Sequence, residues 1–278
     1  MRLSRKLIIS VLAMLAATLA TAQTYPARAQ ATPAQSEAPA LVSPPPSAPV
    51  SGLQVTVTPY LWLAGVHASI ATPLPRAPEV NADVSAIDLL SHLDGVPLLS
   101  GLEIRGEPLS LLADVIHLPV STNITTRNVF YNGGNATLTT NTGTAVLLYH
   151  VLDQPVQSLD AGAGVRAWGF SAGLTLNGAL LPTAGANRSA SWADPLIAAR
   201  YHRELGDGFG LTAYGDVGGF GVGAHVDWQV IGTVDYALKS WVALRLGYRS
   251  LNFNYTAANS IGFNVHMRGP LLAATFRF

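Results

Sequence analysis

The sequence predicts an all-β protein: a closed antiparallel transmembrane β-barrel of about ten strands, with eight as the alternative. Three observations predict it. Residues 51–278 repeatedly alternate apolar and polar side chains, as strands with two different faces do. The chain begins with an export signal, and beyond it no apolar run is long enough for a membrane-spanning helix. In lipid, only helices and closed barrels pair every backbone polar group, so membrane-spanning strands imply a closed barrel.

Residues 1–22 are predicted to be a cleaved signal peptide. The segment has a basic start, an apolar core at residues 7–19 and a small-x-small cleavage site at residues 20–22. A transmembrane anchor is the alternative, but the core is shorter than the roughly 20 residues that a spanning helix needs. The chain contains no cysteine, which excludes disulfides.

Residues 23–50 are rich in Ala, Pro, Gln and Ser and lack aliphatic periodicity, so we expect a disordered periplasmic segment. Residues 51–278 form a single domain by length, the outer-membrane β-barrel. Lys plus Arg and Asp plus Glu number 16 each, and this balance argues against a nucleic-acid partner.

The clearest alternation is in residues 242–249, where Leu244 and Leu246 are expected to face lipid and Ala243 and Arg249 the lumen. The even strand count places both termini in the periplasm. The predicted strands lie near 53–70, 97–106, 109–120, 143–152, 158–174, 190–205, 208–218, 225–238, 241–254 and 262–278. Short turns are expected near 107–108, 153–157, 206–207 and 239–240, and mostly longer external loops near 71–96, 121–142, 175–189, 219–224 and 255–261.

Aromatic side chains near the strand ends are expected at the membrane interfaces, with packing inside a soluble β-sandwich as the alternative. They are Tyr60, Trp62, Trp168, Trp192, Phe209, Trp241, Phe253, Tyr255, Phe276 and Phe278. Pro59, Pro195 and Pro270 would each remove a hydrogen-bond donor from a strand, so we expect them at bulges or strand ends.

Charged side chains of both signs gather on the lumen-facing parity. We expect them to pair across a narrow interior and fill it, with a narrow channel for small solutes as the alternative. The predicted network is Glu103, Arg105, Asp114, Asp160, Arg166, Asp194, Arg200, Glu204, Asp216, Asp227, Arg245, Arg249 and Arg277, with His202 and Asp235 on the same parity.

A repeated G-x-R-x-x-x-F pattern occurs at 164–170 and at 247–253. Either the two segments are similar by chance, or each Gly makes room for side chains of neighbouring strands while each Arg anchors a charge cluster.

Three short patterns resemble catalytic or metal-binding arrangements, but each is weak. His225 and Asp227 lie on one strand parity near a loop, as in outer-membrane proteases, but no acidic pair accompanies them. A His-x-Ser pattern at residues 67–69 is unspecific, and the pair at residues 202 and 204 lacks a third metal ligand. We therefore predict no catalytic, cofactor-binding or metal-binding residues and no cofactor.

The loop at 83–94 has the pattern of a short amphipathic helix, with a capping box from Ser85 to Asp88 and Gly95 as a stop. Its apolar residues would dock over the barrel mouth or against the outer leaflet; an unstructured loop is the alternative. They are Val84, Ile87, Leu90 and Leu93.

The segments at 58–62, 83–94, 215–221, 247–249 and 269–278 together resemble a family of small Gram-negative outer-membrane barrels, akin to opacity-protein and OmpA-type transmembrane domains. The resemblance implies the cell outer membrane, with its lipid and lipopolysaccharide as surroundings. It also implies an assembly signal at Phe276 and Phe278 that the barrel-assembly machinery reads. The family supplies no catalytic residues.

The predicted function is therefore a non-enzymatic outer-membrane barrel with a structural role or a surface ligand at its external loops. A narrow channel and an outer-membrane hydrolase are the alternatives. The closing strand near 262–278 is expected to pair with the first strand.

Overall fold

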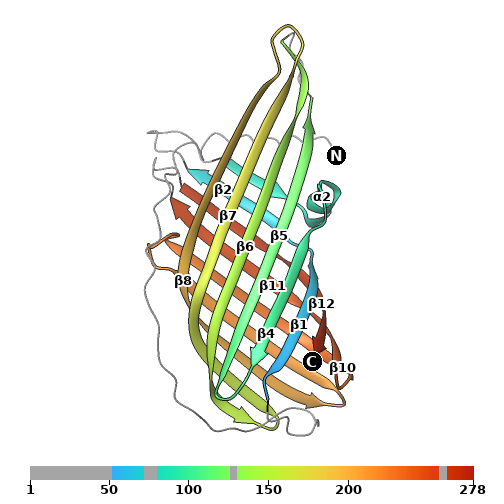
Figure 1. Cartoon of the computed structure of the whole chain (residues 1–278), viewed down its shortest axis with the longest axis vertical. Coiled ribbons are helices and arrows are strands. Elements are labelled where there is room, and N and C mark those ends of the chain that lie inside the picture. Colours follow the sequence, from blue (N-terminus) through green and yellow to red (C-terminus); the bar gives the residue numbers. More distant parts are fainter. Residues whose placement is uncertain (1–51, 72–79, 126–129, 257–261) are drawn as a thin grey trace.

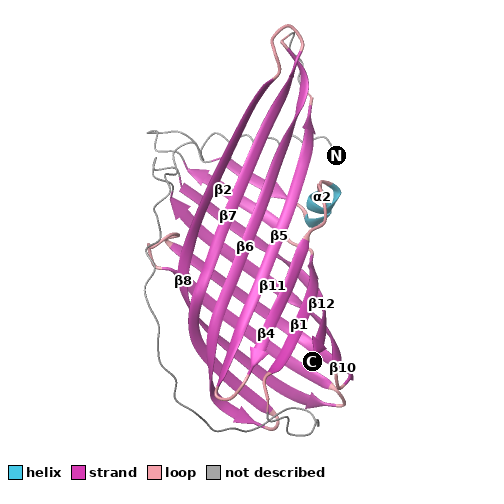
Figure 2. Ribbon diagram, viewed as in Figure 1, coloured by secondary structure: helices cyan, strands magenta, loops and turns pink. Residues whose placement is uncertain are grey.

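Ten antiparallel strands close into a barrel, and two short extra strands lie outside the closed ring (Figures 1 and 2). The computed structural model describes residues 52–71, 80–125, 130–256 and 262–278, so the predicted signal peptide and the 23–50 segment lie outside the described residues. The elements are β1 (Gln54–Trp62), β2 (Gly65–Ala71), β3 (Val80–Val84), α2 (Ala86–Ser91), β4 (Leu98–Arg105), β5 (Leu109–Ile124), β6 (Tyr131–Gln154), β7 (Gln157–Gly178), β8 (Ala184–Gly206), β9 (Phe209–Gly219), β10 (Val226–Lys239), β11 (Val242–Thr256) and β12 (Gly262–Arg277). Among the described residues, no helix is long and apolar enough to cross a membrane.

The barrel closes where β12 pairs with β1, as predicted. The register joins Val57 to Phe276 and Leu61 to Leu272. The run predicted at 53–70 is two strands, because β1 ends at Trp62 and β2 continues along the other half of β12. β3 then pairs with β2, and no other described strand pairs with it. The β1–β12 pair therefore closes the barrel. β2 and β3 form a separate two-stranded extension that pairs with the other half of β12.

The two ends of the barrel differ. At one end, called the turn end, short turns join β4 to β5, β6 to β7, β8 to β9 and β10 to β11, as predicted. At the other, called the ribbon end, β5 to β8 project beyond the remaining strands (Figure 1). β6 alone has 24 residues, whereas a tilted strand crosses a bilayer in roughly 9–11. The prediction of long loops at 121–142 and 175–189 is wrong, because most of these residues belong to β5, β6, β7 and β8.

The three prolines lie inside strands, where one neighbouring ladder is interrupted. Pro195 comes one residue before the β8–β9 ladder begins at Leu196. Pro270 lies between the parts of β12 that pair with β2 and with β1, and Pro59 faces the gap that follows Val57 in the β1–β12 ladder. A missing N–H costs little at such a gap. The prediction of bulges or strand ends is therefore corrected.

Apolar side chains form a belt on the outer surface of the barrel. On β11, Leu244 and Leu246 are exposed while Ala243 and Arg249 are buried, as their alternation predicts. The belt includes Leu102, Val115, Leu147, Val165, Ile197, Leu211, Val217, Val230, Val234, Leu244, Leu246 and Leu272. Exposed charged side chains lie towards the two ends: Arg203 and Lys239 at the turn end, Arg268 and Arg188 towards the ribbon end. Such a belt has the pattern of a lipid-facing surface.

The predicted helix exists but is shorter than its pattern. Ser85 caps it, accepting a hydrogen bond from the Asp88 N–H at 3.1 Å and donating one to the Asp88 carboxylate at 2.7 Å. Helix α2 ends before His92, which is earlier than Gly95. It lies beside β5 in the side of the barrel (Figure 1), where the Ser121 N–H donates to the His92 carbonyl at 2.8 Å. α2 is thus part of the wall rather than a lid.

Candidate functional site

A network of charged side chains crosses the lumen, and Arg166 is one of its two centres. Arg166 donates to Asp227 at 2.6 Å, to Asp216 at 2.7 Å and to Thr144 at 3.0 Å. Trp168 donates its indole N–H to the second oxygen of Asp227 at 3.0 Å. The side chains of Arg166, Asp216 and Asp227 are fully buried. Charge-assisted bonds at these distances hold all three groups in one geometry.

Arg249 is the second centre. It donates to Asp114 at 2.8 Å, to the Tyr60 hydroxyl at 2.7 Å and to the Gln229 carbonyl at 2.8 Å. Gln229 then donates to Asp216 at 3.2 Å, which joins the two centres. We call the joined group the septum. It consists of Tyr60, Asp114, Arg166, Asp216, Asp227, Gln229 and Arg249.

A second cluster lies between the septum and the turn end. Arg200 donates to Glu103 at 2.7 Å and to Asp160 at 2.9 Å, and Arg105 donates to Asp153 at 3.2 Å. Of these, Asp153 was not predicted, because it lies beside a turn. The members come from four strands, so this cluster also ties opposite walls together.

The remaining predicted network residues are spread around this second cluster. Arg245 lies 3.3 Å from Asp235, and Glu204 lies 3.9 Å from His202. The structure gives Arg277 no ion pair within the described residues, although Arg245, Asp235 and Glu204 lie around it.

Asp194 belongs to neither charged cluster. It accepts hydrogen bonds from the Trp192 indole at 2.9 Å and from the Ala224 N–H at 2.6 Å. Its side chain thereby fastens the β9–β10 turn to β8. This turn requires glycine, since Gly219 and Gly221 have φ of 87° and 77°.

The G-x-R-x-x-x-F repeat is structural. Its arginines, Arg166 and Arg249, are the two centres of the septum. Its phenylalanines, Phe170 and Phe253, lie in contact with ring centroids 5.9 Å apart. A Cβ at Gly247 would overlap the backbone of the adjacent strand. The absence of a side chain at Gly247 therefore makes room for this neighbouring backbone, and not for long side chains as predicted.

On the ribbon side of the septum lies an aromatic cluster that the sequence analysis placed at the membrane interfaces. The ring centroids of Trp168 and Phe253 are 4.7 Å apart, those of Phe170 and Trp192 5.5 Å, and those of Trp192 and Tyr255 4.2 Å. These rings face the lumen, and Trp62 is buried with them. The interface assignment is therefore wrong for Trp62, Trp168, Trp192, Phe253 and Tyr255, and also for Tyr60, whose hydroxyl lies in the septum.

Strand parity could have revealed this cluster. Trp168 lies two residues from Arg166, and Trp192 two residues from Asp194, both of which were assigned to the lumen. At the turn end, by contrast, Phe209 and Trp241 are exposed on the outer face as an interface girdle requires.

Two cavities flank the septum. The cavity towards the ribbon end has a volume of about 180 Å³ and an almost entirely apolar wall. The cavity towards the turn end has a volume of about 140 Å³ and includes Glu103, Arg200 and Arg245 in its wall. The septum therefore lies between an apolar chamber and a second chamber with charged residues in a mixed wall, which we call the polar chamber.

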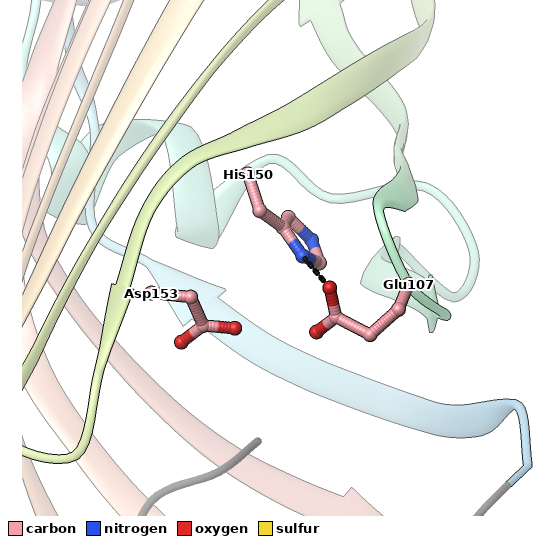
Figure 3. A group of neighbouring side chains, drawn as sticks. All are labelled: Glu107, His150 and Asp153. Carbon is pink, nitrogen blue, oxygen red and sulfur yellow. Dashed lines mark hydrogen bonds and ion pairs between the residues drawn. The ribbon is translucent and has the colours of Figure 1, made fainter. Parts of the chain in front are cut away.

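Glu107, His150 and Asp153 converge at the turn end (Figure 3). His150 Nδ1 lies 3.3 Å from Glu107, but Asp153 is bonded to Arg105, whose charge opposes a cation there. His150 Nε2 also lies 2.8 Å from the Ser110 hydroxyl. Ser110, His150 and Glu107 thus lie in the order of a nucleophile, a base and an acid. Ser110, however, is fully buried and out of reach of a substrate.

The other enzyme candidates are not assembled into a site. Asp227 is buried in the septum, whereas His225 is exposed and lies 3.1 Å from Thr256. His67 pairs with Asp83 at 2.6 Å, while Ser69 donates to Asn81.

The residues of the predicted assembly signal lie at the turn end. Phe276 stacks near Trp241, with ring centroids 6.3 Å apart, and Phe278 is 79% exposed. The Phe278 N–H donates to the Val55 carbonyl at 2.9 Å, which fixes the last residue to β1.

No protein-family model and no curated protein matches the sequence. Among solved structures, the chain is similar to outer-membrane β-barrel proteins. The outer-membrane protease OmpT of Escherichia coli matches with 9% identity over 82% of this chain and 98% of that chain, at a TM-score of 0.49. Ail, the attachment invasion locus protein of Yersinia pestis, matches with 8% identity over 82% and 100%, at 0.36. The toluene transporter TodX of Pseudomonas putida matches with 7% identity over 83% and 90%, at 0.33.

Proposed function

We propose that this chain is a non-enzymatic integral β-barrel of the outer membrane whose lumen is closed to ions and solutes. In this proposal the turn end lies in the periplasm and the β5–β8 ribbon extends outside the cell. The ribbon then serves as a surface for interactions with other molecules.

The observation that carries the proposal is the septum. Its two arginines are buried to 99% or more, and they make six hydrogen bonds of 3.0 Å or less to groups on other strands. Opening a path for an ion would break several of these bonds and leave buried charges without partners. Removing one partner of such a pair costs about 3–5 kcal/mol, so spontaneous opening is rare.

Placement in the outer membrane rests on the closed barrel, its apolar belt and the exposed charges towards the ends. Outer-membrane lipid and lipopolysaccharide would surround the belt. Phe276 and Phe278 would be read by the barrel-assembly machinery during insertion.

The surface role rests on the ribbon. The part of β8 that precedes Leu196 in sequence pairs with β7 alone. One edge of the ribbon therefore has no strand partner among the described residues. Free strand edges can pair with an added strand from another chain. A surface ligand bound at this edge is therefore consistent with the fold.

Solute release from vesicles tests the closed lumen. We expect the full chain, reconstituted in phospholipid vesicles, to release small sugars no faster than protein-free vesicles. A paired Arg249→Ser and Asp114→Ser variant removes opposite charges together and should accelerate release. The matched control, Arg188→Ser on an exposed position, should not. Rapid release by the unaltered chain would refute the proposal.

A narrow channel for small solutes is the second candidate. The polar chamber favours it, because charged groups such as Glu103 and Arg200 line it. This candidate requires the septum to open, and the same vesicle experiment separates the two functions.

A further inference from the structure

The apolar chamber between the septum and the ribbon end has the properties of a binding site. We propose that it binds a small uncharged hydrocarbon group, either a free monocyclic hydrocarbon or the end of a lipid acyl chain. This inference goes beyond the closed-lumen function and does not depend on it, because the chamber lies on one side of the septum.

Carbon atoms make up nearly the whole wall of the chamber. Aromatic rings form part of the wall, and aliphatic side chains, including those of β2, β4, β5 and α2, form much of the rest. The aromatic lining residues are Trp62, Phe170, Trp192, Phe253, Tyr255 and Phe263. Ring faces and edges attract apolar and aromatic groups without requiring a hydrogen bond.

Four polar groups of the wall are bonded to the protein itself or covered by neighbouring atoms. The Trp192 indole donates to Asp194 at 2.9 Å, and His92 Nδ1 contacts the Asp88 carbonyl at 2.7 Å. Trp62 Nε1 and Thr142 Oγ1 have no hydrogen-bond partner among the described residues, but neighbouring atoms cover both. A ligand with a charge or several polar groups would lose its hydration here without gaining partners, so the chamber selects against it.

The septum closes the floor of the chamber. Arg249 places its guanidinium 4.9 Å from the Trp62 ring, covering the ring from the polar side. The positive charge is already matched by Asp114 at 2.8 Å, so it offers no free site for an anionic ligand. A hydrocarbon can therefore enter the chamber but has no apolar route onwards to the polar chamber.

Helix α2 forms the side wall where the sheet is interrupted. β3 and β4 are not paired with each other, so the wall between them consists of side chains rather than a hydrogen-bonded ladder. Leu89, Leu90 and Leu93 face the chamber, whereas Ile87 is 79% exposed on the opposite side. In this proposal a hydrocarbon enters past α2, where no backbone ladder closes the wall.

The volume of about 180 Å³ limits the size of the ligand. A cavity of roughly 150 Å³ lined by aliphatic and aromatic side chains stays dry and binds benzene. A chamber of similar size and chemistry therefore accommodates one ring or several methylene groups of an acyl chain. Filling it replaces empty space with dispersion contacts, which favours binding.

Quenching of tryptophan fluorescence tests the inference on the full chain in phospholipid vesicles. Trp228→Phe and Trp241→Phe remove the two tryptophans exposed on the outer face, leaving Trp62, Trp168 and Trp192 as reporters inside the barrel. One arm adds bromobenzene, whose bromine quenches on contact. The other arm uses vesicles whose lipids carry brominated acyl chains.

Saturable quenching in the first arm identifies a free hydrocarbon as ligand, and quenching in the second identifies an acyl chain. Ala190→Leu on β8 and Ala68→Leu on β2 fill the chamber from different strands. Each should weaken bromobenzene binding about tenfold or more. Ala199→Leu, on the exposed face of β8, is the matched control and should leave binding unchanged.

Competition keeps the test decisive if the filled variants fold poorly. Toluene should relieve the quenching of the unfilled protein, whereas the cation benzamidinium should not. The inference is overturned if bromobenzene quenching does not saturate and the brominated lipids do not quench either, or if benzamidinium competes as well as toluene.

Discussion

Replacement of Arg166 by leucine removes the cation that two septum carboxylates share. Asp216 and Asp227 lie 2.7 Å and 2.6 Å from its guanidinium nitrogens, and all three side chains are fully buried. Arg166→Leu would leave both carboxylates in the barrel interior without a positive partner. One of them must then take up a proton or draw water into the septum.

The expected loss follows from the cost of an unpaired buried charge. Removing one partner of a buried ion pair costs about 3–5 kcal/mol, and two bonded acids place Arg166→Leu at the upper part of that range. The triple variant Arg166→Leu, Asp216→Asn and Asp227→Asn removes all three charges and should regain more than half of the loss. The measurement is urea unfolding of the barrel in phospholipid vesicles, which gives the free energy of unfolding.

Arg188→Leu is the matched control, because Arg188 is exposed and the only hydrogen bond of its side chain to a described residue is to the adjacent Asn187 carbonyl. It should change the free energy of unfolding by no more than about 0.5 kcal/mol. A loss below about 1 kcal/mol for Arg166→Leu, or a triple variant less stable than the single one, would refute the reasoning.

Three further predictions follow from the fold. Deleting Phe278 should lower the amount of barrel that reaches the outer membrane more than it lowers the unfolding free energy of the refolded protein; normal membrane levels would contradict the assembly-signal hypothesis. Gly247→Ala should cost about 1–3 kcal/mol in urea unfolding, because its Cβ would overlap the Gly232 carbonyl, whereas Gly232→Ala meets no atom within 4 Å and should cost far less. Ser85→Ala should speed amide exchange in α2 about fivefold, since an N-cap contributes about 1 kcal/mol, and unchanged exchange would exclude the cap.

Strand periodicity predicted most of the barrel because lipid imposes it. Where strands cross the apolar belt, as at Leu244 and Leu246, one face must be apolar and the alternation is visible. In the ribbon, β6 instead carries a polar run that includes Thr139 and Thr140. The pattern therefore faded, and strands were mistaken for loops.

The charged part of the lumen could be predicted by parity, but the partners could not. Arg166 and Asp227 lie 61 positions apart in sequence, and only the barrel closure brings them together. The apolar chamber was missed for another reason. At Trp168 and Phe253 both the lumen and the lipid are apolar surroundings, so the polarity of these residues does not tell the two faces apart. Only their parity with Arg166 and Arg249 on the same strands would have placed the rings in the lumen.

The helix pattern predicted the N-terminal cap of α2 correctly and only part of its docking. Leu90 and Leu93 line the chamber as an apolar stripe would, but Ile87 points away from it. The interruption of the sheet between β3 and β4 decides which side of α2 packs over the chamber. No local sequence pattern encodes that interruption.

Planar-bilayer conductance of the refolded chain tests the central claim most directly. A lumen closed by the septum predicts that insertion adds no stepwise current at any moderate voltage. The paired Arg249→Ser and Asp114→Ser variant should then produce discrete current steps, because both side chains leave the septum together. Discrete steps of steady amplitude from the unaltered chain would contradict the closed septum and favour the narrow channel.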